Sequence, residues 1–133
     1  MNTDEITKKY DSEKYPELGL TRKIIKCCFN VHNELGSGFN EVIFQRALAV
    51  ELRNAGLPFE REVWLNVMYK GSPIGKKRVD FFVEDCIIEI KAKAGFDPQD
   101  YMQLLAYLKT TGYKLGLLVN FGGRKVEVRR FVN

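Results

Sequence analysis

The sequence has few cysteines and no long apolar segment. Its three cysteines, Cys27, Cys28 and Cys86, are odd in number and do not follow the spacing of a zinc site or a disulfide framework. No segment approaches the roughly 20 apolar residues that cross a bilayer. The first residues also lack the basic and then apolar pattern of a secretory signal. These absences argue against a disulfide-rich secreted domain and a membrane protein, so we expect a cytoplasmic protein without a membrane partner.

Length and composition predict one globular domain. A chain of 133 residues can enclose one substantial core, and a hydrophobic share of 45% with a charged share of 29% is typical of water-soluble domains. Residues 1–19 are mostly polar and are interpreted as an N-terminal tail, which leaves residues 20–133 for the domain. The net charge of +4 favours a polyanionic partner, although many proteins that bind no nucleic acid share such a charge.

The segment from Val79 to Ala92 predicts a β-hairpin that carries two acids. Two runs of β-branched and aromatic residues flank the polar residues 84–85, which we interpret as the turn. With the turn centred there, Asp80 faces Glu89 directly across the ladder. Two like charges in that position are unfavourable unless they are neutralised, and a divalent cation bound by their oxygens would do so.

A lysine extends this pattern. Lys91 follows Glu89 by two residues, so both side chains lie on the face that carries Asp80. The other face is apolar and is expected to be core: Val79, Phe81, Val83, Ile88, Ile90 and Ala92. Two acids and a lysine suit phosphodiester hydrolysis, because the acids can hold Mg²⁺ while the lysine orients the attacking water. Charges that alternate with isoleucine are also typical of the solvated face of a half-buried sheet, and this segment alone fits either interpretation.

Hydrophobic periodicity predicts an α/β fold with three helices and five strands. Caps and glycines mark the helix ends, with Thr21, Asn40 and Asp97 as the expected N-caps. Residues 69–75 are expected to form a turn. The predicted helices cover residues 21–35, 41–55 and 98–111, and the predicted strands cover residues 57–68, 76–83, 86–92, 114–121 and 125–132.

Three helical residues are further candidates for the site. Glu41 heads the apolar stripe of the second predicted helix, so it either complements the helix dipole or turns toward the hairpin as a third carboxylate. Gln103 and Tyr107 are four residues apart and share one side of the third helix, away from its expected core stripe of Tyr101, Leu104, Leu105 and Leu108. They are either surface residues or neighbours of the site.

Basic residues near the hairpin are candidates for phosphate contacts. Lys76 and Lys77 open the second strand of the hairpin, Lys93 follows its end, and Arg124 precedes the last strand. No element looks built to read base edges, so we expect binding that is electrostatic and blind to sequence. The alternative is that these residues form ordinary solvated strand ends.

Residues 31–44, with the sequence VHNELGSGFNEVIF, resemble the signature of the small bacterial GxxExxY proteins of the PD-(D/E)XK nuclease superfamily. Phe44 stands where that family has tyrosine. The resemblance runs from about Leu20 to the C-terminus and includes the segments 51–53, 69–71, 79–80, 89–92, 103–108 and 116–121.

The resemblance implies a restriction-endonuclease-like core, in which helices flank a mixed β-sheet, and a Mg²⁺- or Mn²⁺-dependent nuclease activity. It implies that Asp80, Glu89 and Lys91 are the catalytic set, that Glu41 is an additional acid of the metal site, and that Gln103 and Tyr107 line the site as in an exonuclease-like branch.

Three hypotheses follow for the function. The first is a metal-dependent nuclease that hydrolyses DNA without sequence preference. The second is a nucleic-acid or protein interaction module that keeps the fold and the acids without turnover. The third is a homodimeric endonuclease that acts on branched DNA, against which Gln103 and Tyr107 argue because they resemble the exonuclease-like motif.

Overall fold

The structure is a computed structural model that describes residues 18–133, so most of the predicted tail lies outside the described residues. Its elements are α2 (Leu18–Leu35), α3 (Glu41–Asn54), β1 (Glu60–Tyr69), β2 (Ser72–Val83), β3 (Cys86–Lys91), α4 (Pro98–Thr111), β4 (Leu115–Asn120) and β5 (Glu127–Val132). Within residues 18–133, no helix is both long and apolar enough to cross a membrane.

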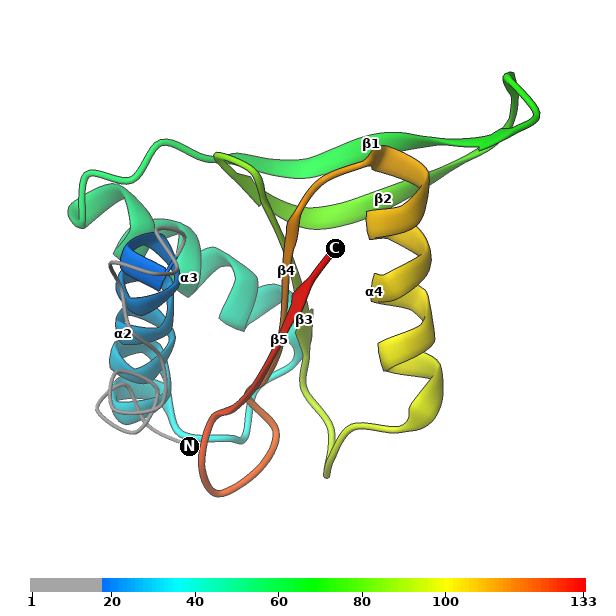
Figure 1. Cartoon of the computed structure of the whole chain (residues 1–133). Helices are drawn as coiled ribbons and strands as arrows, with labels where there is room; N and C mark the ends of the chain where they lie inside the picture. The colour runs from blue at the N-terminus through cyan, green and yellow to red at the C-terminus, as the bar shows by residue number, and fades with distance from the viewer. Residues whose placement is uncertain (1–17) are drawn as a thin grey trace.

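The five strands form one mixed sheet in the order β1-β2-β3-β4-β5. All neighbours are antiparallel except β3 and β4, which are parallel because α4 carries the chain back between them. Helices α2 and α3 cover one face of the sheet and α4 covers the other (Figure 1). The predicted mixed sheet with flanking helices is therefore confirmed.

Two apolar clusters fill the spaces between these layers. The first lies under α2 and α3 and includes Phe44, Leu48, Phe81, Ile88, Leu117 and Phe121. The second lies under α4 and comprises Leu65, Val79, Ile87, Leu104, Tyr107, Leu108 and Leu118. Strand β4 is buried along its whole length, as its continuous apolar run predicts for a strand covered on both faces.

The structure corrects the predicted start of the first helix. Helix α2 includes Leu18 and Gly19, which the polar pattern of residues 1–19 places in the tail, and Thr21 is buried inside the helix instead of capping it. The third helix follows its caps as predicted. Asp97 accepts a hydrogen bond from the backbone N–H of Asp100, and Gly112 ends the helix with a left-handed φ of 74°.

Strands β1 and β2 form a longer hairpin than the sequence pattern predicts. Strand β2 begins at Ser72 instead of residue 76, because Lys70 and Gly71 both adopt positive φ and close a two-residue turn. We call residues 64–78 the arm. It crosses one end of the sheet, passes over α4, and its tip projects beyond that helix (Figure 1).

The hairpin bends where the arm joins the sheet. Glu62 has a φ of 53° and lies between the pairs Arg61–Phe81 and Val63–Val79. Strict alternation places Val79 and Phe81 on one core face, but Val79 packs in the α4 cluster and Phe81 in the α2 and α3 cluster. The predicted single core face is thus wrong at Val79, because the bend turns the two halves of β2 toward different helices.

Candidate active site

Asp80 and Glu89 meet where β2 and β3 separate. The ladder pairs Val83 with Cys86, as the predicted turn requires, and extends to Phe81 and Ile88. Beyond that pair the two acids replace the ladder with side-chain hydrogen bonds. The backbone N–H of Asp80 donates to Glu89 Oε1 at 3.0 Å, and the N–H of Ile90 donates to Asp80 Oδ2 at 2.7 Å. The two acids are neighbours as predicted, but each bonds the other strand's backbone.

A second pair of side chains fixes Asp80 from the helical side. Gln45, on α3, donates from Nε2 to Asp80 Oδ1 at 3.0 Å. Its own Oε1 accepts a hydrogen bond of 3.0 Å from the guanidinium of Arg61 on β1. Gln45 is only 7% exposed, so its amide orientation is set by these two partners. Arg61 therefore helps to fix the orientation of the Asp80 carboxylate by holding the amide of Gln45.

The two acids are costly to ionise together. Glu89 is 7% exposed. Its burial, together with the negative charge of Asp80, raises its pKa to about 8. Burial likewise raises the pKa of Asp80, although the hydrogen bonds from Ile90 and Gln45 and the charge of Lys91 oppose this. Such a pair gains from any positive charge placed between its members.

Glu41 lies on the same side of the molecule. It begins α3, and its pKa is raised mainly by partial loss of solvent. Lys91 lowers that pKa and Asp80 raises it, while Glu41 in turn raises the pKa of Glu89. Glu41 thus contributes to the electrostatic field of the acid pair, but its side chain is exposed and makes no hydrogen bond to either acid among those described above.

The ammonium groups beside the acids are held by the start of α4. Lys91 Nζ lies 3.8 Å from Asp100 Oδ1, and Lys93 Nζ lies 2.6 Å from Asp100 Oδ2 and 2.8 Å from Asp97 Oδ2. Burial raises the pKa of Asp100, but its bonds with Lys93 and the backbone of Asp97 outweigh this and lower it. Lys93 was expected to contact phosphate; two carboxylates already neutralise its charge.

The backbone after β3 is pinned by the end of β4. The buried Asn120 accepts from the N–H of Lys93 at 3.0 Å and donates to its carbonyl at 2.9 Å. Gly122 packs so closely there that a Cβ would lie 2.2 Å from the backbone nitrogen of Lys93. Only glycine fits this approach, and the contact holds the end of β3 that carries Lys91.

Tyr107 borders the acid pair from α4. It is 8% exposed, and its pKa is raised by burial and then by the charges of Glu89 and Asp80. Gln103 lies about one turn earlier on α4 and is half-buried. The predicted core stripe is corrected here: Leu105 is 46% exposed, while Tyr107 joins Leu104 in the core. The helix is rotated relative to the prediction and turns Tyr107 inward.

Sequence reasoning missed Gln45 and Asp100. Gln45 follows Glu41 by four residues, which places both on one side of α3. Asp100 precedes Gln103 by three residues and Tyr107 by seven, which is the same helical stripe. These spacings are the signals that could have found them.

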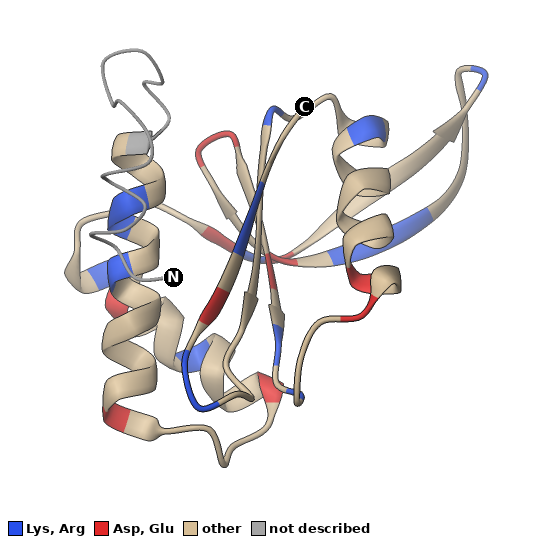
Figure 2. Ribbon diagram, turned by 60° about the horizontal axis from the view of Figure 1, so that its bottom comes forward, with Lys and Arg blue, Asp and Glu red and all other residues tan. Residues whose placement is uncertain are grey.

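The other predicted phosphate contacts are exposed residues outside the acid pair. Lys76 and Lys77 are exposed on the arm, where they form part of a basic segment of β2 (Figure 2). Arg124 is exposed in the loop between β4 and β5. That loop is tied to α2 by His32, whose Nε2 donates to the carbonyl of Gly123 at 3.0 Å.

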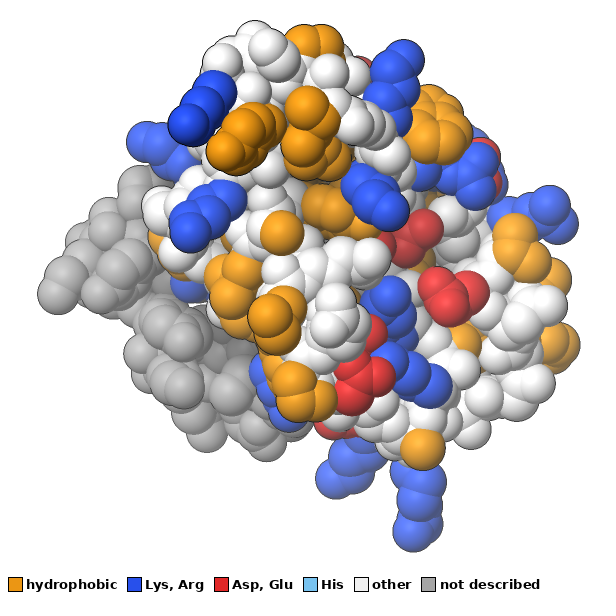
Figure 3. Space-filling model, turned by 90° about the vertical axis from the view of Figure 1, so that its right-hand side faces the viewer, with side chains coloured by type: hydrophobic (Ala, Val, Ile, Leu, Met, Phe, Trp, Pro, Cys, Tyr) orange, Lys and Arg blue, Asp and Glu red, His pale blue; other side chains and the backbone are white. Residues whose placement is uncertain are grey.

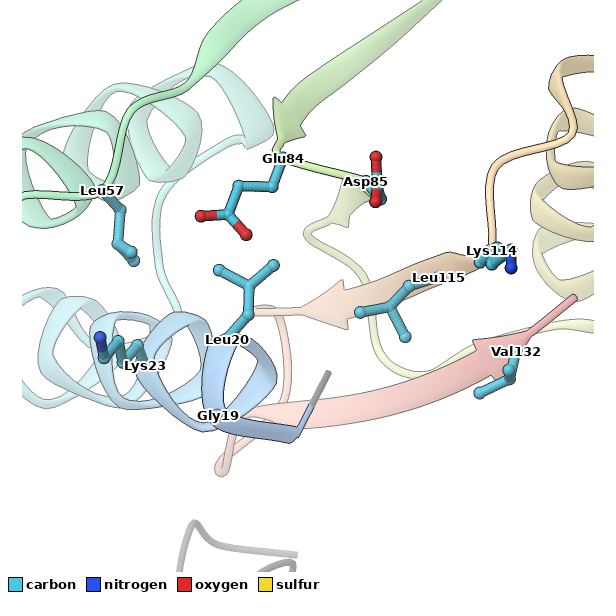
Figure 4. Close-up of a pocket in the computed structure, with 9 residues that line it drawn as sticks. All are labelled: Gly19, Leu20, Lys23, Leu57, Glu84, Asp85, Lys114, Leu115 and Val132. Carbon is cyan, nitrogen blue, oxygen red and sulfur yellow. The ribbon is translucent and has the colours of Figure 1, made fainter. Parts of the chain in front are cut away.

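A cavity of about 570 Å³ lies at the end of β3 and β4 that is opposite to Lys91 and Asn120 (Figure 4). It adjoins the turn at residues 84–85 and the first residue of β4, whereas Lys91 and Asn120 end these two strands. Its lining residues are Gly19, Leu20, Lys23, Leu57, Glu84, Asp85, Lys114, Leu115 and Val132. The cavity therefore does not belong to the acid cluster.

The donor set fits a hard divalent cation in chemistry. Asp80 and Glu89 offer carboxylate oxygens, Oε2 of Glu89 is not used in the hydrogen bonds above, and the pair repels itself when ionised. Between residues 18 and 133, no three His, Cys, Asp or Glu side chains converge closely enough to enclose an ion as they stand.

Comparison with known proteins identifies the family. The sequence model of the PD-(D/E)XK nuclease superfamily matches residues 19–131. The search among curated proteins gives no match. A solved structure titled "Crystal structure of SSO0001" superposes with a TM-score of 0.57 at 20% identity, over 92% of this chain and 59% of that one. This likeness concerns the fold, and this chain spans little more than half of the other's length. On the family match, the chain belongs to the PD-(D/E)XK nuclease superfamily.

Proposed function

We propose that the protein is a metal-dependent nuclease that hydrolyses phosphodiester bonds of DNA. The observation that carries the proposal is the pair formed by the half-buried Asp80 and the buried Glu89, whose repulsion calls for a cation, with Lys91 two residues beyond Glu89 on the same strand. We also place the chain in the GxxExxY branch, on its resemblance over residues 31–44.

Each residue of the acid cluster has a role in this proposal. Asp80 and Glu89, with Glu41, would hold Mg²⁺ or Mn²⁺, which supplies a polarised phosphate and a more acidic bound water. Lys91 orients the attacking water and stabilises the charge that develops on phosphate. Asp100 keeps the Lys91 ammonium in place at 3.8 Å. The aromatic ring of Tyr107 limits water on the α4 side of Glu89.

Phosphate contacts outside the cluster are assigned to exposed cations. Lys76, Lys77 and Arg124 are exposed, so they can neutralise a nucleic-acid backbone. Lys93 is assigned a different role, because its ammonium lies within 2.8 Å of both Asp97 and Asp100. It steadies the start of α4 beside the acids. Affinity should therefore fall steeply with salt and show no preference for sequence.

Cleavage assays test the proposal directly. Purified protein is incubated with labelled single-stranded DNA, duplex DNA and RNA, with Mn²⁺ or with a chelator. We expect cleavage of DNA that requires metal and is lost in Asp80→Asn. Glu84→Gln is the matched control, because Glu84 is an exposed acid at the turn of the same hairpin. Binding without cleavage of any substrate would favour the non-catalytic interaction module.

A further inference from the structure

The arm carries a basic charge of one sign. Between Val63 and Val79 the sequence has no acid, and its cations are Lys70, Lys76, Lys77 and Arg78. All four are exposed. The ribbon shows these positions as a long basic segment of β2 and a basic tip (Figure 2). A protruding hairpin with this charge is complementary to a phosphate backbone.

The arm also exposes aromatic and large aliphatic side chains. Trp64, the single tryptophan of the chain, is 61% exposed, and Tyr69 is 60% exposed. Met68 and Ile74 are 44% and 64% exposed. Viewed from the α4 side, hydrophobic and basic side chains are interspersed over the upper part of the surface (Figure 3). Exposed rings gathered on one short segment indicate a binding surface.

Each exposed ring has a cation beside it. The guanidinium of Arg78 lies 5.7 Å from the centroid of the Trp64 ring, and Lys70 Nζ lies 5.5 Å from that of Tyr69. Trp64 pairs with Arg78 across the ladder, and Asn66 pairs with Lys76. The side chains of these two ladder pairs, Trp64 with Arg78 and Asn66 with Lys76, share the face opposite to Leu65. The side chain of Leu65 packs under α4. A ring next to a cation can stack on a base while the cation meets its phosphate.

The arm is continuous with the acid cluster along β2 and meets it at the bend beside Glu62. Arg78 is two residues before Asp80 on β2, and Ser72 at the tip is eight residues before it. At about 3.3 Å per residue the tip lies roughly 26 Å along the strand from Asp80. A strand bound along the arm would therefore enter the site from this side.

We propose that the arm binds single-stranded nucleic acid through base stacking on Trp64 and Tyr69 and feeds it to the acid cluster. This inference rests on the proposed nuclease function for its second half only. Unpaired nucleotides are favoured over duplex because their bases present open faces, whereas duplex bases are already stacked on one another. Cations alone would bind both forms.

The single tryptophan makes the test direct. Trp64 emission is followed in the full chain, with chelator present so that nothing is cleaved, while a single-stranded oligonucleotide or its duplex is added. We expect saturable quenching by the single strand and at least tenfold weaker binding of the duplex. Anisotropy of labelled oligonucleotide should show Trp64→Ala and Tyr69→Ala weakened about tenfold each, and Trp64→Phe weakened less.

Matched variants separate stacking from charge and from loss of structure. Met102→Ala is the control, because Met102 is 62% exposed on α4 outside the arm. It should leave affinity unchanged. The double change Lys76→Ala and Lys77→Ala should reduce the salt slope of single-strand binding by about 1.4, since each neutralised phosphate contributes about 0.7. Circular dichroism melts confirm that each variant is folded.

Four outcomes would overturn the proposal. The first three are equal affinity for single strand and duplex, Trp64 emission that does not change when oligonucleotide is added, and unchanged single-strand affinity of folded Trp64→Ala. The fourth is a wild-type protein that binds no oligonucleotide but forms a dimer, which dissociates in Trp64→Ala. The last would identify the arm as a contact between copies of the chain. Cleavage with Mn²⁺ is scored separately. Single-strand binding without cleavage would support the role proposed for the arm and contradict the proposed nuclease function. Cleavage with equal affinity for single strand and duplex would support the nuclease function and contradict the role of the arm.

Discussion

Strand β2 carries charged side chains in two different environments, one largely buried and one exposed to solvent. Near its end, Asp80 is held by hydrogen bonds from Gln45 and Ile90, and burial raises its pKa. In the arm, residues 72–78 are all exposed, and among the described residues the one acid that forms an ion pair with its cations is the exposed Glu62, which lies 3.7 Å from Arg78. Buried charges interact strongly and are weakly screened, while exposed ones are screened by salt. In our proposals, hydrolysis takes place at the buried end of the strand and binding of the substrate at its exposed end.

The largest expected effect is on turnover at the buried end. Glu89→Gln removes a ligand charge but keeps an acceptor for the N–H of Asp80. We expect cleavage to fall by roughly 100- to 1000-fold or more, because the metal loses one of its three proposed carboxylate ligands. Oligonucleotide affinity in chelator should stay within about twofold, because the arm is unchanged. Single-turnover rates and anisotropy measure the two effects.

Glu84→Gln is the matched control for this change, since it alters the same charge at the exposed turn. It should keep wild-type turnover. If Glu89→Gln cleaved as fast as Glu84→Gln, the division between the two ends of β2 would be wrong.

The second effect separates Lys91 from the cations of the arm. Lys91→Ala should slow cleavage roughly 100-fold while binding of oligonucleotide and Mn²⁺ persists, because its role is expressed in the transition state. Lys77→Ala should do the reverse, with weaker binding and an unchanged rate at saturating substrate. Rates at saturation and calorimetric Mn²⁺ titrations distinguish them. Equal loss of affinity in both variants would contradict the separate roles.

The third effect tests how the buried end is held together. Asp100→Asn removes the charge that keeps Lys91 and Lys93 at the start of α4 and weakens a capping box. We expect roughly tenfold slower turnover, with stability lowered by about 0.5–2 kcal/mol as for other cap losses. Urea titrations and cleavage rates measure both.

Asp100→Glu keeps the charge and serves as the rescue variant for this prediction. If Asp100→Asn lowered stability but left turnover unchanged, Asp100 would be a cap and would not position Lys91.

Local patterns in the sequence were sufficient for the acid hairpin and the caps of α4, and insufficient for the partners of Asp80 and for the arm. The hairpin turn, the acid pair and the caps of α4 follow from residues near one another in the chain. The hydrogen bond from Gln45 to Asp80 joins residues 35 positions apart, so no local pattern reveals it. The bend at Glu62 and the turn at Lys70 both use positive φ at residues that seldom adopt it. The length of the arm was therefore underpredicted.

The last effect is a dependence of metal-free stability on pH. The native pKa of Glu89 is about 8, above its usual value of 4.5, so the folded protein binds more protons than the unfolded chain between these values. Stability in chelator should therefore be highest near pH 5 and fall as pH rises toward 8. Asp80, whose pKa is also raised, adds to the fall. The lowered pKa values of Asp97 and Asp100 act in the opposite direction, at lower pH.

Urea titrations at pH 5, 6.5 and 8 measure this slope, and Glu89→Gln isolates its cause. The variant cannot lose the proton in question, so its stability should fall less across the range and exceed that of wild type at pH 8. Mn²⁺ competes with protons for the same oxygens, so adding it should stabilise wild type most at pH 8 and the variant little. Parallel curves for the two proteins would show that Glu89 ionises as an ordinary surface acid. The contrast between the buried and exposed ends of β2 would then lose its electrostatic basis.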